Sequence, residues 1–246
     1  MKRQNLRILL LIISLLLFPI TMWYMSPYLI IQGALEGIIT GSFILFCCML
    51  IGSIFFGRFF CAWLCPMGGM QECLALVNPR PPKQGLRNLI KYGIWTVWIL
   101  AIVLCFLLRK NTISVDFLYM TDHGISISSI YHYVIYYGVI FLVLIPAVVG
   151  GKRLFCHYFC WMAPFMVIGT KIRQLLHLPG LHIHSEKEQC ISCQKCSKAC
   201  PMGIHVAEAV SSEKGFGAEC IQCGVCVDSC PKKALAYRFG IERGKK

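Results

Sequence analysis

Near the C-terminus one cysteine spacing occurs twice, and it constrains the fold more than any other feature of the chain. Each run has the form Cys-x₂-Cys-x₂-Cys-x₃-Cys-Pro, the bacterial pattern that binds cubane iron–sulfur clusters. Three thiolates on one tight turn hold three irons, and the fourth cysteine, placed before a proline, reaches the other cluster. The spacing therefore predicts two [4Fe–4S] clusters and single-electron transfer. The predicted ligand sets are Cys190, Cys193, Cys196 and Cys230 for one cluster and Cys220, Cys223, Cys226 and Cys200 for the other.

Two other uses of cysteine fit these runs less well. Zinc takes four ligands, usually as two separated Cys-x₂-Cys pairs, and would leave the third and fourth cysteines of each run unexplained. Disulfides would suit a secreted miniprotein, but the residues that precede the runs place them beside a membrane.

The chain has 246 residues, of which 57% are hydrophobic and 14% are charged. Apolar segments of about 18 residues or more are typical of transmembrane helices. We therefore predict an α-helical membrane domain over residues 1–185, with four transmembrane helices in two duplicated two-helix units. A cytoplasmic two-cluster ferredoxin-like α+β domain follows over residues 186–246. The predicted transmembrane segments are Ile8–Met25, Leu35–Phe56, Ile90–Leu108 and Tyr133–Val149.

Basic residues at the ends of these segments predict the orientation. Lys2, Arg3 and Arg7 precede the first segment, and more lysines and arginines follow the second and the fourth, whereas the opposite side has only Arg109 and Lys110. Both termini are therefore expected in the cytoplasm, at the inner membrane, where thiols stay reduced. The net charge of +13 then fits anionic lipid headgroups. Nucleic acid is excluded as a partner because the charges flank apolar segments and form no separate basic domain.

The apolar part contains an internal repeat with an offset of 95 residues, as from Cys61 to Cys156. In each copy an apolar segment ends in glycine and a basic residue, and a Cys-x₃-Cys motif follows, formed by Cys61 and Cys65 and by Cys156 and Cys160. Pro66 predicts that Cys65 starts a short helix, whose positive end would lower the pKa of the thiol. The four cysteines fit three uses: ligands of one metal cluster between the repeats, two redox-active thiol pairs, or buried structural residues.

The combination of these motifs resembles the membrane polyferredoxin of the periplasmic nitrate reductase system, its quinol dehydrogenase membrane component. It is also similar to the C-terminal half of the nitrous-oxide reductase regulator family. In the polyferredoxin family both membrane motifs are Cys-x₃-Cys-Pro. This chain matches with Cys61, Cys65 and Pro66 and departs from the pattern at Trp161, which follows Cys160. The resemblance implies oxidation of membrane quinol and passage of electrons onward, often with a second ferredoxin subunit.

The sequence has no Cys-x₂-Cys-His motif for covalent haem and no Gly-x-Gly-x₂-Gly after a strand for nicotinamide or flavin. We therefore expect an electron-transfer subunit of a membrane quinol oxidoreductase, which relays electrons between the quinone pool and a partner redox subunit or ferredoxin. The alternative is an accessory protein that donates electrons for maturation of a copper or iron site. Trp63, Trp161 and His157 are candidates for a quinone site, and the sequence identifies no catalytic residue.

Overall fold

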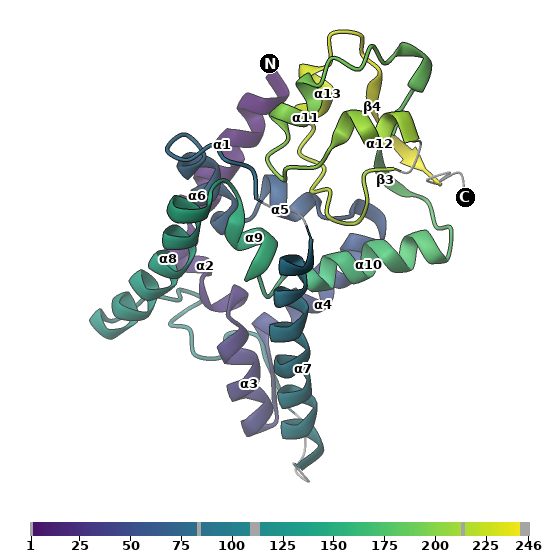
Figure 1. The fold of residues 1–246 in the computed structure, drawn as a ribbon. Coiled ribbons are helices and arrows are strands. Elements are labelled where there is room, and N and C mark those ends of the chain that lie inside the picture. The colour runs from purple at the N-terminus through teal and green to yellow at the C-terminus, as the bar shows by residue number, and fades with distance from the viewer. Residues whose placement is uncertain (1, 83–84, 109–113, 213–214, 242–246) are drawn as a thin grey trace.

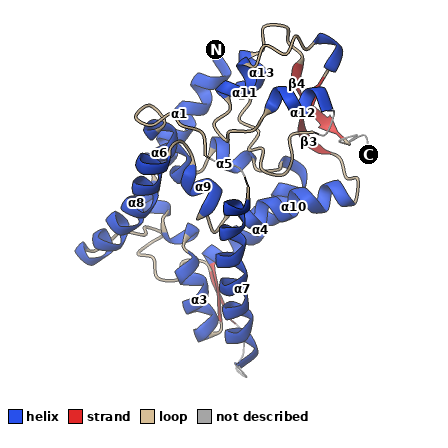
Figure 2. Cartoon of the chain, in the orientation of Figure 1, coloured by secondary structure: helices blue, strands red, loops and turns tan. Residues whose placement is uncertain are grey.

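The computed structural model describes residues 2–82, 85–108, 114–212 and 215–241. Its helices surround a core at the middle of the molecule, and a small module with the C-terminus covers one end (Figure 1). The strands are few and short (Figure 2). The helices and strands, in chain order, are α1 (Lys2–Leu16), α2 (Phe18–Thr21), η1 (Trp23–Met25), α3 (Pro27–Glu36), β1 (Ile38–Thr40), α4 (Gly41–Phe56), α5 (Phe59–Trp63), α6 (Pro66–Leu74), η2 (Leu86–Leu89), α7 (Ile90–Leu108), β2 (Ser114–Asp116), α8 (Ile130–Gly150), α9 (Leu154–Tyr158), α10 (Ala163–Leu175), β3 (Gly180–Ser185), η3 (Lys187–Gln189), α11 (Lys195–Ala199), α12 (Val206–Ser212), α13 (Val225–Ser229) and β4 (Leu235–Gly240).

The predicted architecture of four transmembrane helices is wrong. Among the described residues, two helices are long and apolar enough to cross a membrane, Leu86–Leu108 and Ile130–Gly150. These correspond to the third and fourth predicted segments, and α7 has the predicted bounds. The first and second predicted segments do not form continuous helices. The predicted duplication of a transmembrane two-helix unit is therefore wrong as well.

Local backbone signals break the other two segments. In the first, α1 ends at Leu16, and the chain continues through the four-residue α2, which has a proline in its first turn, into a 3₁₀ turn. In the second, Gly37 adopts a left-handed conformation (φ 76°) at the end of α3, and strand β1 separates it from α4. The 16 residues of α4 extend about 24 Å at 1.5 Å per residue, less than the roughly 30 Å of a bilayer core.

Two small sheets complete the fold. Strand β1 pairs with β2 in parallel, and β3 pairs with β4 antiparallel with Gly180 opposite Gly240. The second sheet joins the two ends of the C-terminal module. Because β3 begins at Gly180, the paired strands of the module start before the predicted boundary at residue 186.

The module is held against the helical part by polar contacts from several elements. Gln4 of α1 donates to the Cys223 carbonyl (3.1 Å), and the Trp63 indole of α5 donates to the Gln222 carbonyl (3.3 Å). Arg3 of α1 forms an ion pair with Asp228. The N-terminal end of α1 consequently lies beside the module, while α3, α7 and α8 extend away from it (Figure 1). This arrangement brings the module next to the helices that carry the Cys-x₃-Cys motifs.

Candidate iron–sulfur sites

The two cysteine runs of the module fold in the same way, with an offset of 30 residues from Cys190 to Cys220. Ser192 and Gln222, which are equivalent in the two runs, both have positive φ (53° and 54°). Gln194 and Gly224 are also equivalent, and each is the left-handed residue that precedes a five-residue helix, α11 or α13. These turns curl each run around its first three cysteines, as a cluster-binding loop must do.

The structure brings the eight cysteines of the runs together in two groups of four. A cavity of about 380 Å³ of empty space is lined by Cys190, Cys193, Cys196 and Cys230. A second cavity of about 340 Å³ is lined by Cys200, Cys220, Cys223 and Cys226. In each cavity three cysteines come from one run and the fourth from the other, the same grouping that the spacing predicts. The remaining lining is mainly apolar, for example Val210 in the first cavity and Phe216 in the second.

The donor chemistry of these cavities fits an iron–sulfur cluster. Burial raises the pKa of Cys220 to about 12, so a cation is needed to hold this sulfur as a thiolate. The peptide N–H groups of residues 202–204 lower the pKa of Cys200, although burial raises it more. Such N–H groups stabilise charge on cluster sulfur. When bound, a cluster supplies one-electron chemistry, and these residues would hold it.

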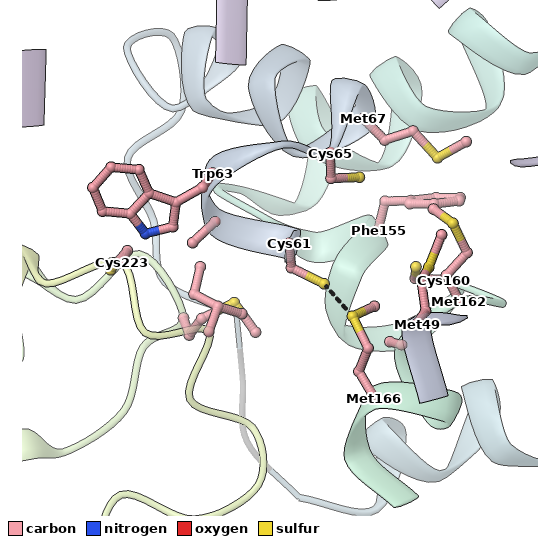
Figure 3. Close-up of a cluster of buried hydrophobic side chains, with 14 of the residues drawn as sticks. Met49, Cys61, Trp63, Cys65, Met67, Phe155, Cys160, Met162, Met166 and Cys223 are labelled. Atoms are coloured by element: carbon pink, nitrogen blue, oxygen red, sulfur yellow. Dashed lines mark hydrogen bonds between the residues drawn. The ribbon is translucent and has the colours of Figure 1, made fainter. Parts of the chain in front are cut away.

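The Cys-x₃-Cys motifs of the helical part form a second site, here called the four-cysteine site. Cys61, Cys65, Cys156 and Cys160 are each 4% exposed. Every pair among them is close enough for a charge on one thiol to affect another. Cys61 lies in α5, Cys156 lies in α9, and the other two precede α6 and α10. Figure 3 shows Cys61, Cys65 and Cys160 within one buried cluster with several methionines. The two motifs therefore converge, which their sequence separation of 95 residues does not indicate.

The two repeats contact each other reciprocally around this site. The Cys61 thiol lies 3.7 Å from the Met166 sulfur, and the Gln71 side-chain amide donates to the Cys156 sulfur at 3.0 Å. Gln71 and Met166 are themselves separated by 95 residues. Each repeat thus places the same position against the first cysteine of the other repeat. The sequence repeat contained this information, but the pairing became evident only in the structure.

The second cysteine of each motif faces peptide N–H groups at the start of the following helix. Cys65 has the extended conformation before Pro66 that the sequence predicts, and the Gly68 N–H lowers its pKa. The equivalent Ala163 N–H acts on Cys160. The predicted net lowering of the Cys65 pKa is nevertheless wrong, because burial raises it well above the ordinary value. Burial and the neighbouring thiols Cys156 and Cys61 raise the pKa of Cys160 to about 12. All-thiol redox chemistry at neutral pH is therefore disfavoured here, whereas a bound metal would deprotonate these groups.

Two completely buried arginines flank the four-cysteine site, and one of them, Arg58, is the basic residue that the sequence predicts beside the first Cys-x₃-Cys motif. Arg58 and Arg153 are each 0% exposed. Arg58 pairs with Glu219, which also binds Lys91 at 2.6 Å. Arg153 pairs with Glu72 at 2.7 Å. Burial opposes ionisation of both glutamates, but the cations lower the pKa of each to about 2. The site thus lies in a fixed positive field.

The described residues contain no group of three or more His, Cys, Asp or Glu side chains suited to a metal ion. The cysteines of the module are thus not grouped as a single tetrahedral ion, with metal–sulfur distances of about 2.3 Å, would hold them.

The three aromatic and imidazole candidates for a quinone site have structural roles. His157 is fully buried, with Nε2 at 3.0 Å from the Met202 carbonyl and Nδ1 at 3.3 Å from Asn88. The Trp161 indole donates to the Met25 carbonyl at 3.1 Å. The Trp63 indole lies between the Cys61–Cys65 turn and Cys223 (Figure 3).

An apolar pocket opens beside the four-cysteine site. It has about 630 Å³ of empty space, and residues of α4, α5 and α10 line it. Met166, whose sulfur contacts Cys61, forms part of its wall. Another wall residue, Phe59, stacks on Trp63 with ring centres 5.0 Å apart. Ser53 and Cys48 are the polar side chains of the wall, so the pocket suits an apolar molecule that carries one or two polar groups.

In comparison with known proteins, both regions are similar to iron–sulfur domains. A 4Fe–4S binding domain matches residues 38–84 and 131–179, and a 4Fe–4S dicluster domain matches residues 187–235. The chain is also 25% identical to YccM of Escherichia coli, a protein named for electron transport, over 88% of this chain and 60% of YccM. The chain is related to iron–sulfur electron-transfer proteins. Its Cys-x₃-Cys repeats thus fall within the matched 4Fe–4S binding domains.

Other relatives match at similar or shorter length. An uncharacterised protein of Methanocaldococcus jannaschii is 25% identical over 79% of this chain and 78% of its own length. The NAD(P)H-quinone oxidoreductase subunit I of Gloeobacter violaceus is 37% identical over 22% of this chain and 31% of its own. No solved structure matches the chain significantly. The matches support the broader class of iron–sulfur electron-transfer proteins rather than the two specific families that the sequence resembles.

Proposed function

We propose that this protein relays single electrons between the membrane quinone pool and a partner redox protein. The observation that carries the proposal is the position of the apolar pocket, one side chain (Met166) away from the four-cysteine site. A quinol that binds there would lose two electrons and two protons, and iron–sulfur groups accept the electrons one at a time. The relative from Gloeobacter violaceus, which is named for quinone oxidoreduction, also supports quinone as the membrane partner.

The exposed surface supports a location in the membrane. In the most apolar windows of Leu86–Leu108 and Ile130–Gly150, only 11% of the residues are buried within the protein. Val97 of α7 and Val134 of α8, for example, are 70% and 72% exposed. An apolar surface of this extent is costly in water. We propose that α7 and α8 lie in the cytoplasmic membrane, with the module on the cytoplasmic side.

Filling the pocket provides the test of quinol oxidation. Gly52 lies on the pocket wall, and a side chain at this position would meet no atom within 4 Å. Gly52→Phe is therefore expected to place its ring in the pocket and to abolish cluster reduction by a menaquinol or ubiquinol analogue in liposomes. Reduction by dithionite should remain unchanged. The matched control is Gly93→Phe in α7, where a side chain also meets nothing within 4 Å. Equal rates of quinol oxidation in the two variants would contradict the proposed pocket.

The four-cysteine site is proposed to hold a third iron–sulfur group. Its support is the convergence of four buried thiols, together with the match of a 4Fe–4S binding domain to both repeats. The module alone would bind about eight irons, and a third cubane would add about four. Cys156→Ala should therefore lose about four irons per chain with the corresponding EPR signal. Cys73→Ala, which removes an exposed thiol, is the control. An unchanged iron content in Cys156→Ala would rule out the third group.

A further inference from the structure

The two buried arginines occupy equivalent positions of the repeat, but their surroundings differ. Arg58 and Arg153 are separated by 95 residues, and neither is exposed to solvent. A guanidinium group has five N–H donors and no acceptor. A buried donor without a partner destabilises the protein. The hydrogen bonds of the two side chains therefore show which guanidinium has partners for all its nitrogen atoms within the protein.

Arg153 uses all three of its nitrogen atoms. Its Nε and Nη2 donate to the Glu72 carboxylate at 3.2 and 2.7 Å, and its Nη1 donates to the Cys61 carbonyl at 3.0 Å. Arg7 reinforces the same carboxylate at 2.6 Å. Arg153 therefore fixes one repeat against the other, and each of its nitrogen atoms has a partner within the protein.

Arg58 uses only one nitrogen atom. Its Nη1 donates to the Glu219 side chain and lies 3.4 Å from the Glu219 carbonyl. Its Nε and Nη2 are buried and have no hydrogen-bond partner among the described residues. Arg153 donates to the carbonyl of Cys61, the first cysteine of the other repeat. Among the described hydrogen bonds, Arg58 has no equivalent bond to the first cysteine of its partner repeat, Cys156.

The guanidinium of Arg58 lies on the side of the four-cysteine site. It interacts electrostatically with Cys61, Cys156 and Cys160. Burial raises the pKa of Cys61, and Arg58 is the first of the groups that oppose this rise, through its charge and through a side-chain contact with the thiol. The guanidinium that carries the two spare donors is thus near sulfur atoms that would become thiolates on binding iron.

We propose that Arg58 donates hydrogen bonds to the iron–sulfur group of the four-cysteine site and serves as its positive counter-charge, which makes Arg58 the residue that sets its reduction potential. This inference rests on the proposed third group. Four thiolates give such a group a net negative charge, and each electron adds one more. In a low-dielectric interior a nearby fixed cation stabilises the reduced form. Hydrogen bonds to cluster sulfur act in the same direction.

The contact with Glu219 extends the role of Arg58 to the module. Glu219 immediately precedes Cys220, which lines the second module cavity. Its carboxylate accepts hydrogen bonds from Arg58 and Lys91. One guanidinium therefore joins the four-cysteine site to the segment that carries a predicted cluster ligand. A change at Arg58 should affect the four-cysteine site more than the module, because the proposal directs the two spare donors of Arg58 to the four-cysteine site.

The test is an EPR-monitored redox titration of the full-length protein in detergent, with iron content measured in parallel. Arg58→Gln should lower the midpoint potential of the third group so that, at a fixed poise, the ratio of reduced to oxidised protein falls at least tenfold. This is about 59 mV for a one-electron couple. Arg153→Gln should lower stability but shift the potential less, because the donors of Arg153 are already engaged. A shift in Arg58→Gln no larger than that in Arg153→Gln would overturn the proposal.

A second measurement does not depend on folding of a variant. Unmodified protein is labelled with a magnetic nitrogen isotope at arginine, and hyperfine spectroscopy of the reduced third group should detect a coupled arginine nitrogen. The coupling should disappear in Arg58→Lys, which keeps the charge, and persist in Arg153→Lys. A third-group signal without arginine coupling would refute only the proposed role of Arg58. Absence of any third-group signal in the unmodified protein would instead refute the proposed function of the four-cysteine site.

Discussion

The module and the four-cysteine site both arise from internal repeats, but they differ in exposure. Cys193 in the module is exposed, and Cys190 beside it is partly exposed. At the four-cysteine site each thiol is 4% exposed. In the proposed relay, electrons would therefore enter the four-cysteine site from the apolar pocket and leave from the first module cavity to a docked protein. The direction in space would run from the pocket to the exposed end of the module.

The cavity lined by Cys200, Cys220, Cys223 and Cys226 lies between these two ends. Its loop residue Gln222 receives the Trp63 indole and the Tyr237 hydroxyl at its carbonyl, at 3.3 and 2.6 Å. Gly57 has a positive φ of 57°, which favours glycine, and a Cβ here would lie 2.6 Å from the Gln222 side-chain amide, which would have to move. The close approach of the two regions at this point shortens the path that electrons would travel. The comparison can be tested at each region in turn.

The largest expected effect is loss of a module cluster, and it tests the exchange of the fourth ligand. Cys230 lies in the second run but lines the cavity of the first. Cys230→Ala should therefore lose about four irons and reproduce the EPR spectrum of Cys193→Ala rather than that of Cys223→Ala. The opposite result would show that each run keeps its own fourth cysteine. Cys73→Ala, at an exposed thiol, should retain the unmodified spectrum.

The next effect concerns the anchoring of the four-cysteine site through Glu72. Glu72→Gln leaves Arg7 and Arg153 buried without a counter-charge, a change that typically costs about 3–5 kcal/mol. The module makes no contact with Glu72 among the described hydrogen bonds and ion pairs. Chemical unfolding of the helical part, followed by tryptophan fluorescence, should therefore shift to lower denaturant while the module EPR signals persist. Simultaneous loss of both would show that the two regions unfold as one unit.

The pH dependence of this contribution has a definite sign. Glu72 has its pKa lowered from 4.5 to about 2 in the folded protein. Its stabilising effect is therefore complete above about pH 4.5 and declines as the pH falls toward 2. Unmodified protein should lose stability over this acidic range, and the difference from Glu72→Gln should shrink there. Iron release is recorded separately, so that loss of clusters in acid is not mistaken for loss of the ion pair.

The sequence predicted the module and the four-cysteine site to different extents for a physical reason. In the module, the ligands of one cavity lie within a few residues of each other, apart from the fourth, so spacing alone reveals the grouping. The convergence of the two Cys-x₃-Cys motifs depends on contacts of α5 with α10 and of α6 with α9, which spacing does not describe. The buried pairs of Arg58 with Glu219 and Arg153 with Glu72 join residues that are far apart in sequence.

The helical part shows what hydropathy alone misses. Hydropathy predicted α7 with its observed bounds, because no strong backbone break interrupts that segment. It treated residues 35–56 as one helix, although Gly37 in a left-handed conformation ends α3 there. Glycine is the residue that adopts this conformation at least cost, so the break was present in the sequence as a single residue within an apolar run.

The smallest expected effect concerns a position at which the two repeats of the four-cysteine site differ. Gly68 is equivalent to Ala163, a completely buried residue with a side-chain methyl group. At Gly68 a Cβ would lie 2.6 Å from the Cys61 carbonyl and 3.3 Å from Arg153. Gly68→Ala should therefore displace the Cys61 turn and destabilise the protein by about 1–3 kcal/mol, with a broadened EPR signal of the third group. Ala163→Gly, which creates space instead, should cost only about 1 kcal/mol through helix propensity and leave the signal sharp. Equal spectra would mean that the Cys61 turn tolerates displacement and that the close packing of the repeats does not fix the geometry of the site.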